Sequence, residues 1–146
     1  MSTRLKQKLE QIQNVLENLA LESSSRGIPI VVEGKKDVET LHALSINGKI
    51  ISAKTGRKTL LDLLFEIEKS TPQEVILLFD FDRRGREWTR RLKQHLEAER
   101  IKVNLTFWCE LFKLLGKDIK DIESLEAYLE TLSRKTLKIQ KKPHST

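Results

Sequence analysis

The amino-acid sequence predicts an α/β fold in which a four-stranded parallel sheet lies between helices. Short apolar runs alternate with segments whose apolar residues recur every three or four positions, a pattern typical of strands separated by helices. Each connection is long enough for a crossover, and crossovers join parallel strands. The chain has 146 residues, the size of one domain, and 38% of them are hydrophobic, which supports a folded core.

An added amphipathic helix is expected at the start of the chain, within residues 1–27. Leucine and isoleucine alternate at spacings of four and three between residues 3 and 22, which places them in one apolar stripe. The stripe consists of Leu5, Leu9, Ile12, Leu16 and Leu19. Three serines, an arginine and Gly27 then end the helix. We expect this helix to cover the domain or to support a homodimer.

The core of the domain is expected to span residues 28–109. Its strands are expected at residues 28–32, 49–53, 75–79 and 102–106, and its helices at residues 37–45, 60–70 and 84–100. The strand segments are continuous apolar runs, typical of strands buried on both faces, although the fourth is weaker. Asp37 is expected to cap the first of these helices, and Gly34, Gly56 and Gly85 are expected at turns or caps.

The C-terminal part is expected to be helical over residues 110–132 and to end in a basic tail over residues 133–146. The tail contains no acid and carries five of the six net positive charges, at Arg134, Lys135, Lys138, Lys141 and Lys142. We expect it to be mobile, and a non-specific attraction to nucleic acid is the functional alternative.

The composition argues against a membrane protein and against a disulfide-stabilised one. The longest apolar runs fall far short of the roughly 18 residues of a membrane span. The single cysteine, Cys109, cannot form an internal disulfide, and no secretory signal pattern is present. We therefore expect a reducing, cytoplasmic location.

Three acidic residues follow two of the apolar runs directly: Glu33, Asp80 and Asp82. The strand-to-helix loops of a parallel sheet meet at one edge, so we expect these side chains to converge there. If the extended backbone continues past Phe79, Asp80 and Asp82 project to one side and Phe81 to the other. Paired carboxylates suit Mg²⁺, or alternatively Mn²⁺, because Mg²⁺ binds through one or two carboxylates together with water and phosphate.

Each of these acids, taken alone, has a simpler explanation. Asp82 could cap the helix that follows it, and Glu33 could pair with Lys35 or Lys54. Capping explains neither the second aspartate two residues earlier nor an acid that ends another strand and precedes a glycine. A metal site is therefore the favoured interpretation. Glu33 is the candidate for acid–base catalysis, because crowded negative charges raise the pKa of at least one carboxyl.

Basic residues accompany the acids in the strand-to-helix loops. Several of them stand at the start of the third core helix, where backbone N–H groups and the helix dipole favour anions. The candidates for binding phosphate or nucleic acid are Lys35, Lys36, Lys54, Arg57, Lys58, Arg83, Arg84, Arg86 and Arg90. The alternative is that some of these charges offset the acids or pair with Glu87.

These residues form two motifs that resemble those of the Toprim superfamily. One is Glu33-Gly34 after an apolar strand, and the other is Asp80-Phe81-Asp82 after a second strand, with Gly85 three residues later. The resemblance covers residues 28–106 and points to the small stand-alone archaeal proteins, and more distantly to ribonuclease M5, primases and topoisomerases. It implies a Rossmann-like four-stranded parallel sheet, an acid–base or metal-binding role for Glu33, and Mg²⁺ binding by Asp80 and Asp82.

The chain also departs from that family in ways that limit its function. Many members have a third acid where this chain has Arg84, which leaves one or two metals open. The only tyrosine, Tyr128, lies in a predicted amphipathic helix, which argues against a topoisomerase, and one cysteine cannot form the zinc site of a primase.

The leading hypothesis is a Mg²⁺-dependent nuclease or another factor that acts on RNA or DNA phosphodiesters. The alternative is a non-catalytic nucleic-acid-binding or scaffold module of an RNA- or DNA-processing complex. A third reading is hydrolysis of small phosphate esters by an unrelated α/β fold.

Overall fold

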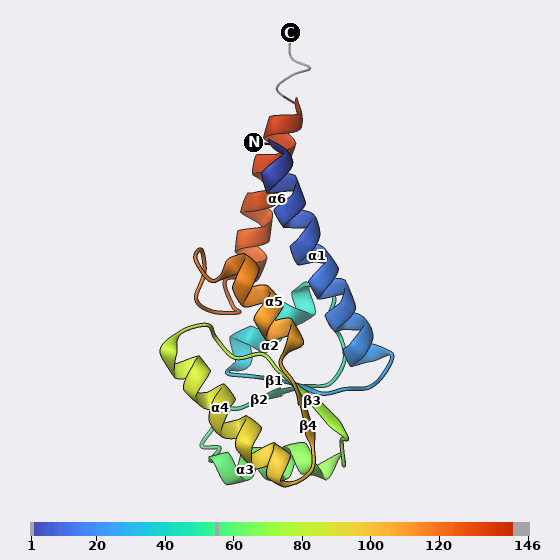
Figure 1. Cartoon of the computed structure of the whole chain (residues 1–146), viewed down its shortest axis with the longest axis vertical. Helices are drawn as coiled ribbons and strands as arrows, with labels where there is room; N and C mark the ends of the chain where they lie inside the picture. Colours follow the sequence, from blue (N-terminus) through green and yellow to red (C-terminus); the bar gives the residue numbers. More distant parts are fainter. Residues whose placement is uncertain (1, 55, 142–146) are drawn as a thin grey trace.

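The structure is a computed structural model that describes residues 2–54 and 56–141. Its centre is a four-stranded parallel sheet with the strand order β2-β1-β3-β4 (Figure 1). The strands are β1 (Ile30–Val32), β2 (Ile50–Ser52), β3 (Glu74–Leu77) and β4 (Lys102–Asn104). The predicted α/β class with a four-stranded parallel sheet is confirmed. β1 and β3 lie side by side at the centre, with Val31 opposite Leu77.

Three helices form the crossovers between the strands: α2 (Lys35–Ala43), α3 (Leu60–Lys69) and α4 (Arg83–Ala98). The start of α3 shows why a helix begins there, because Thr59 and Asp62 cap each other. The Thr59 hydroxyl accepts a hydrogen bond from the Asp62 N–H at 3.1 Å, and the Asp62 carboxylate accepts one from the Thr59 N–H at 2.9 Å.

Strand residues alternate between two apolar cores, one on each face of the sheet. Ile76 and Leu78 belong to the core that is shared with α1 (Ser2–Ser24), α5 (Thr106–Leu115) and α6 (Leu125–Lys141). Val75 and Leu77 belong to the other core, which α3 and α4 cover (Figure 1). The helices therefore enclose the sheet from both sides, as the continuous apolar strands predict.

Helices α1 and α6 pack against each other and run in opposite directions (Figure 1). Together they extend beyond the sheet, and we refer to this pair as the stalk. Ile12 and Leu19 of the predicted apolar stripe are fully buried in the stalk's base, where α1 also contacts α5. The N-terminal helix therefore covers one face of the domain. None of the helices in the described residues has the length and apolar content needed to span a membrane.

The C-terminal elements differ from the expected boundaries. α5 begins at Thr106, so the expected boundary between residues 109 and 110 falls inside a helix. α6 continues to Lys141, so residues 133–141 extend a helix rather than form a separate tail. The reason is that basic residues favour helix almost as well as alanine does, and Leu132 and Thr136 remain buried on α6. Residues 142–146 of the predicted tail lie outside the described residues.

Candidate functional site

The candidate site lies where the two central strands end. Glu33 follows β1 directly, and Asp80 stands three residues after β3. The pairing of the two chains persists beyond the strands, because the Leu78 N–H donates to the Val31 carbonyl at 2.9 Å. Since parallel strands point the same way, both acids are delivered to the same edge of the sheet.

The side chains of Glu33 and Asp80 lie within hydrogen-bonding reach of each other. Glu33 is 14% exposed, and its Oε1 accepts an ion-paired hydrogen bond from Lys54 Nζ. Its other oxygen, Oε2, is buried and accepts no hydrogen bond from the groups of the described residues as long as Asp80 is ionised. Two ionised carboxylates have no proton to share, so a direct hydrogen bond between them requires that one be protonated.

The pKa values of the two acids move in opposite directions. Burial and the hydrogen bond with Glu33 raise the pKa of Asp80 to about 8. Burial alone would raise the pKa of Glu33 as well, but hydrogen bonds from Asp80 and Lys54 and the charge of Arg84 outweigh it and lower that pKa. At neutral pH the pair therefore holds one proton and one negative charge.

Asp82 does not join this pair. Its side chain is the N-cap of α4, and its Oδ1 accepts a hydrogen bond from the Gly85 N–H at 2.8 Å. In residues 2–54 and 56–141, no three Asp, Glu, His or Cys side chains are gathered as ligands for one metal ion. Of the three predicted carboxylates, the structure brings together Glu33 and Asp80 and uses the third as a cap.

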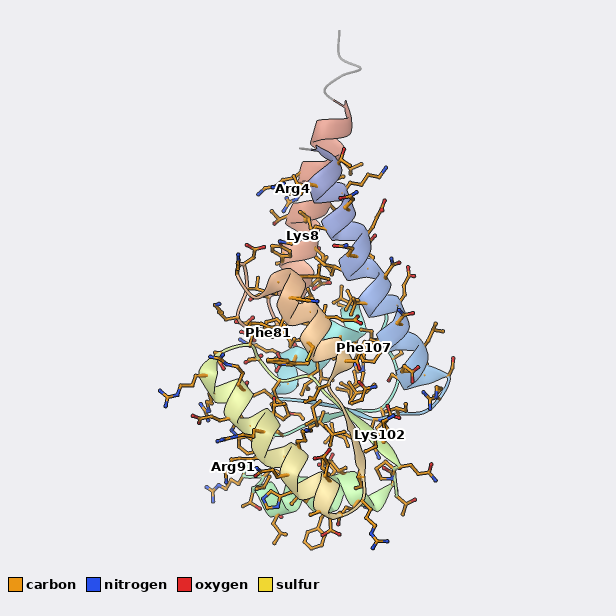
Figure 2. All side chains as sticks on the ribbon, in the orientation of Figure 1. Arg4, Lys8, Phe81, Arg91, Lys102 and Phe107 are labelled. Atoms are coloured by element: carbon orange, nitrogen blue, oxygen red, sulfur yellow. The ribbon has the colours of Figure 1, made fainter. Side chains whose placement is uncertain are left out.

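The reason lies in the backbone at Asp80. Phe79 packs in the core beneath α4, whereas Phe81 packs in the opposite core, near α5 (Figure 2). Residues two apart in a strand share a face, so the chain has turned between these two rings. The Lys120 carbonyl fixes the turn by accepting the Phe81 N–H at 2.8 Å. The extended backbone does not continue past Phe79, and Asp80 and Asp82 do not project to one side.

Gly85 allows α4 to start directly on the backbone of Asp80. A Cβ atom at this position would lie 2.1 Å from the Asp80 carbonyl oxygen and 2.7 Å from its carbonyl carbon. Only glycine fits so close to another backbone. Gly85 was predicted at a turn or cap, and it lies in the first turn of α4, where its N–H completes the cap with Asp82.

The other predicted turn and cap residues lie at two loops. Gly34 is the N-cap of α2, and Asp37 is the third residue of that helix rather than its N-cap. The Asp37 carboxylate still caps the helix, because it accepts the Gly34 N–H at 2.9 Å. Gly56 has a φ of 70°, in the left-handed region that favours glycine.

The predicted phosphate-binding residues fall into three groups. The charges of Lys54 and Arg84 act on Glu33. Lys58 and Arg83 have other partners, since Lys58 pairs with Glu66 and donates to the Ser52 carbonyl at 2.7 Å, and Arg83 pairs with Glu87 at 3.4 Å. The rest occupy exposed positions on α2, α4 and the loop before α3, and they are Lys35, Lys36, Arg57, Arg86 and Arg90.

The loop over residues 116–124, between α5 and α6, also contacts the site, and sequence reasoning missed it. Besides the Lys120 contact with Phe81, the Ile122 N–H donates to Asp80 Oδ1 at 3.2 Å. The Thr40 hydroxyl of α2 donates to the Glu123 carbonyl at 3.3 Å. The loop therefore contacts both helix α2 and the segment that follows β3.

This loop adds negative charge to the edge of the sheet that holds Glu33, Asp37 and Asp80, which we refer to as the acidic edge. Burial raises the pKa of Asp37, and the charges of Glu33, Glu123 and Asp121 raise it further. No spacing in the sequence marks the two loop acids, because they lie some 40 residues beyond Asp80 and in no recognisable motif. Only the packing of the C-terminal helices brings them to this edge.

Comparison with known proteins identifies related chains. A family model described as the Toprim domain matches residues 28–107. The UPF0292 protein MJ1624 of Methanocaldococcus jannaschii is 40% identical over 121 residues, which cover 82% of this chain and 91% of that protein. A UPF0292 protein of Methanosarcina barkeri is 35% identical over 131 residues, covering 90% of this chain and 89% of that one. The solved structure of a protein from Aquifex aeolicus aligns with a TM-score of 0.64 and 30% identity, over 76% of this chain and 94% of that chain.

Proposed function

This chain belongs to the Toprim domain family, and we propose that it binds Mg²⁺ between Glu33 and Asp80 and cleaves nucleic-acid phosphodiesters. Metal binding and a role on nucleic acid are the general theme of the family. The observation that supports this more specific proposal is the pair of partly buried carboxyls, Glu33 and Asp80. They share one proton and lie beside two basic side chains, Lys54 and Arg84.

The residues at this edge fit a magnesium ion. Glu33 Oε2 is a buried oxygen that has no hydrogen-bond donor among the described residues when Asp80 is ionised, and Asp80, whose pKa is raised, lies within hydrogen-bonding reach of the Glu33 side chain. A cation that replaced the shared proton would be coordinated by both carboxylates and would balance their negative charges. Mg²⁺ commonly uses only one or two carboxylates and fills its remaining positions with water and phosphate oxygens, so the loss of Asp82 to capping does not exclude it.

The protein's own residues have separate roles in this proposal. Asp80 and Glu33 would hold the ion, which when bound polarises a phosphoryl oxygen and lowers the pKa of a bound water. Glu33 would also accept and return a proton, and Lys54 orients it through the ion pair at Oε1. Arg84, at the start of α4, would attract the phosphate together with the free N–H groups of that helix end.

A cleavage assay tests the proposal directly. Labelled single-stranded and duplex RNA and DNA are incubated with the protein and Mg²⁺ or Mn²⁺, alongside Asp80→Asn and Glu33→Gln. Asp62→Asn is the control, because it changes an exposed capping carboxylate at α3. We expect metal-dependent cleavage that both site variants lose and the control retains. Cleavage that Asp80→Asn leaves undiminished would refute the proposal.

One observation favours the non-catalytic alternative. The Ile122 N–H already occupies Asp80 Oδ1, and the third carboxylate, Asp82, serves as a helix cap. A protein with this arrangement would bind nucleic acid or a processing complex without turnover. The alternative predicts that wild type cleaves none of the substrates and that binding survives Glu33→Gln.

A further inference from the structure

We propose that one side of the α1–α6 stalk is a second contact surface for a polynucleotide, so that the ligand extends from the acidic edge along this helix pair. The inference rests on the proposed function in taking nucleic acid as the ligand. It goes further by assigning residues outside the strand-to-helix loops and by requiring a ligand several nucleotides long.

The stalk brings together the two ends of the sequence, both of which are basic. The first turns of α1 carry Arg4, Lys6 and Lys8, and the second half of α6 contains Arg134 and Lys135. Figure 2 shows Arg4 and Lys8 on the part of α1 that extends away from the sheet, beside α6. Residues more than 120 positions apart, such as Lys8 and Lys135, thus lie on the same helix pair.

The charge is divided between two sides of the stalk. A hollow of about 510 Å³ between α1, α6 and residues 117–118 has four charged side chains in its lining: Lys8, Lys117, Lys135 and Asp118. A second hollow, of about 820 Å³, has the opposite balance, with three glutamates and one arginine: Glu17, Glu126, Glu130 and Arg134. Consecutive helix residues point about 100° apart, which is how Arg134 and Lys135 line different hollows. One side of the stalk therefore attracts anions and the other repels them.

The basic hollow is held in shape by a polar cluster. Lys8 Nζ lies 2.6 Å from Asp118 Oδ2, which also accepts the Tyr128 hydroxyl at 2.8 Å. The Lys8 ammonium lies 5.7 Å from the centroid of the Tyr128 ring, within the range of a cation–π contact. These contacts fasten the start of the 116–124 loop to both stalk helices.

The same loop joins the basic hollow to the acidic edge. Asp118 contacts the stalk, and Ile122, four residues later, donates to Asp80. Lys117, directly before the first anchor, and Lys120, between the two anchors, are exposed. Lys117 and Lys120 therefore stand between the candidate site and Lys135 on the stalk, among three loop acids, Asp118, Asp121 and Glu123, of which Asp118 is paired with Lys8. A polynucleotide backbone carries a negative charge at each phosphate, so it could contact several of these separated lysines at once.

The position of Lys135 sets the length of ligand required. It is ten residues beyond the start of α6, or about 15 Å along the helix at a rise of 1.5 Å per residue. At 3.4 Å per base pair, this distance corresponds to about four base pairs of duplex beyond the acidic edge. A ligand confined to the strand-to-helix loops would not reach Lys135, whereas one of about 20 base pairs would contact both surfaces.

The test is equilibrium binding without turnover. Fluorescence anisotropy is measured in EDTA with labelled duplex RNA and DNA of about 6 and about 20 base pairs, lengths chosen from the helical rise. The variants are Lys135→Glu and Lys117→Glu, and the matched control is Arg134→Glu, which makes the same charge change at the adjacent residue on the acidic side. All three positions are exposed, and a thermal melt checks that each variant is folded.

We expect each lysine variant to weaken binding of the long duplex by roughly eightfold at 0.1 M salt and to lower the salt slope by about 1, the effect of losing one phosphate contact. The lysine variants should bind the short duplex as tightly as wild type does. The Arg134→Glu control should bind both duplexes as tightly as wild type does. Equal losses in Lys135→Glu and Arg134→Glu, or no loss in either lysine variant, would overturn the proposal.

The same measurements separate this proposal from the nuclease proposal. In one outcome, wild type cleaves none of the substrates while both lysine variants still bind the long duplex more weakly and the short duplex normally. In that case the stalk proposal is supported and the nuclease proposal fails. If wild type cleaves the long duplex with Mg²⁺ and Lys135→Glu binds and cleaves it equally well, only the stalk proposal fails.

Discussion

The backbone N–H of Ile122 donates a hydrogen bond to Oδ1 of Asp80 at a distance of 3.2 Å. A residue from the α5–α6 loop thus holds one of the two carboxyls at the candidate site, 42 positions earlier in the chain. Because the bond comes from the main chain, it constrains Asp80 whichever side chain residue 122 carries. The C-terminal helices are therefore part of the site's architecture and not an independent extension.

Stability should depend on pH through Asp80. Its pKa of about 8 in the folded state is above the ordinary value of 3.8, so the folded protein binds this proton more tightly than the unfolded chain does. The contribution to stability is present at low pH and is lost as the pH rises from about 4 to about 8. Without divalent metal, we expect Tm to fall over this range, and to fall less in Asp80→Asn. Thermal melts across that range in EDTA provide the measurement, and equal slopes would contradict the prediction.

Metal binding should strengthen over part of the same range. Below a pH of about 8, a cation at the pair must displace the Asp80 proton, so its apparent affinity should rise by up to tenfold per pH unit and level off above that value. The increase in Tm on adding Mg²⁺ measures this, because a ligand that binds only the folded state stabilises it by mass action. Asp62→Asn should follow wild type, and an Mg²⁺ effect independent of pH would argue against the pair as ligands.

Asp82 should matter for stability more than for metal affinity. Its carboxylate caps α4, so Asp82→Ala should lower the free energy of unfolding by about 1 kcal/mol. Asp82→Asn keeps an oxygen that can accept the Gly85 N–H, and it should cost less. Chemical denaturation and Mg²⁺ titration of both variants separate the two effects. A loss of Mg²⁺ affinity in Asp82→Asn as large as in Asp80→Asn would show instead that Asp82 is a ligand.

The two motif glycines should respond differently to alanine. At Gly85 the added Cβ would lie 2.1 Å from the Asp80 carbonyl oxygen, so the start of α4 must move. At Gly34 φ is −143°, which any residue adopts, and the nearest atom to an added Cβ is Asp37 Oδ2 at 4.0 Å. We expect Gly85→Ala to destabilise the protein by about 1–3 kcal/mol and to weaken Mg²⁺ binding. Gly34→Ala is the matched control, and an equal loss in both would contradict this account.

The N-terminal helix should contribute strongly to stability. Leu19 is fully buried between α1 and the rest of the core, whereas Leu21, two residues later, is 59% exposed. Leu19→Ala should cost about 2–5 kcal/mol, because it leaves a cavity in a packed interior, and Leu21→Ala should change little. Urea denaturation of the two variants compares the same substitution in one helix. Similar midpoints would mean that α1 does not share the core.

The chain's local patterns were enough to predict much of the fold. Continuous apolar runs such as residues 75–79 indicate strands buried on both faces, and the leucine stripe of residues 5–19 indicates a helix with one buried side. These signals depend only on the spacing of neighbouring residues, so they can be read without knowing the tertiary contacts. The same is true of Glu33 and Asp80, because parallel strands with crossover connections deliver their C-terminal ends to one edge.

The direction of Asp82 and the role of residues 116–124 depended on contacts between distant parts of the chain. Phe81 turns into the core near α5 because Trp108 and Phe112 pack against it, with ring centroids at 5.7 and 5.6 Å, and this turn separates Asp80 from Asp82. The packing of α6 on α1 likewise sets the course of the loop and pairs the two basic ends of the chain. Local periodicity shows which face of an element is buried, but only the packed structure shows which distant residues cover it.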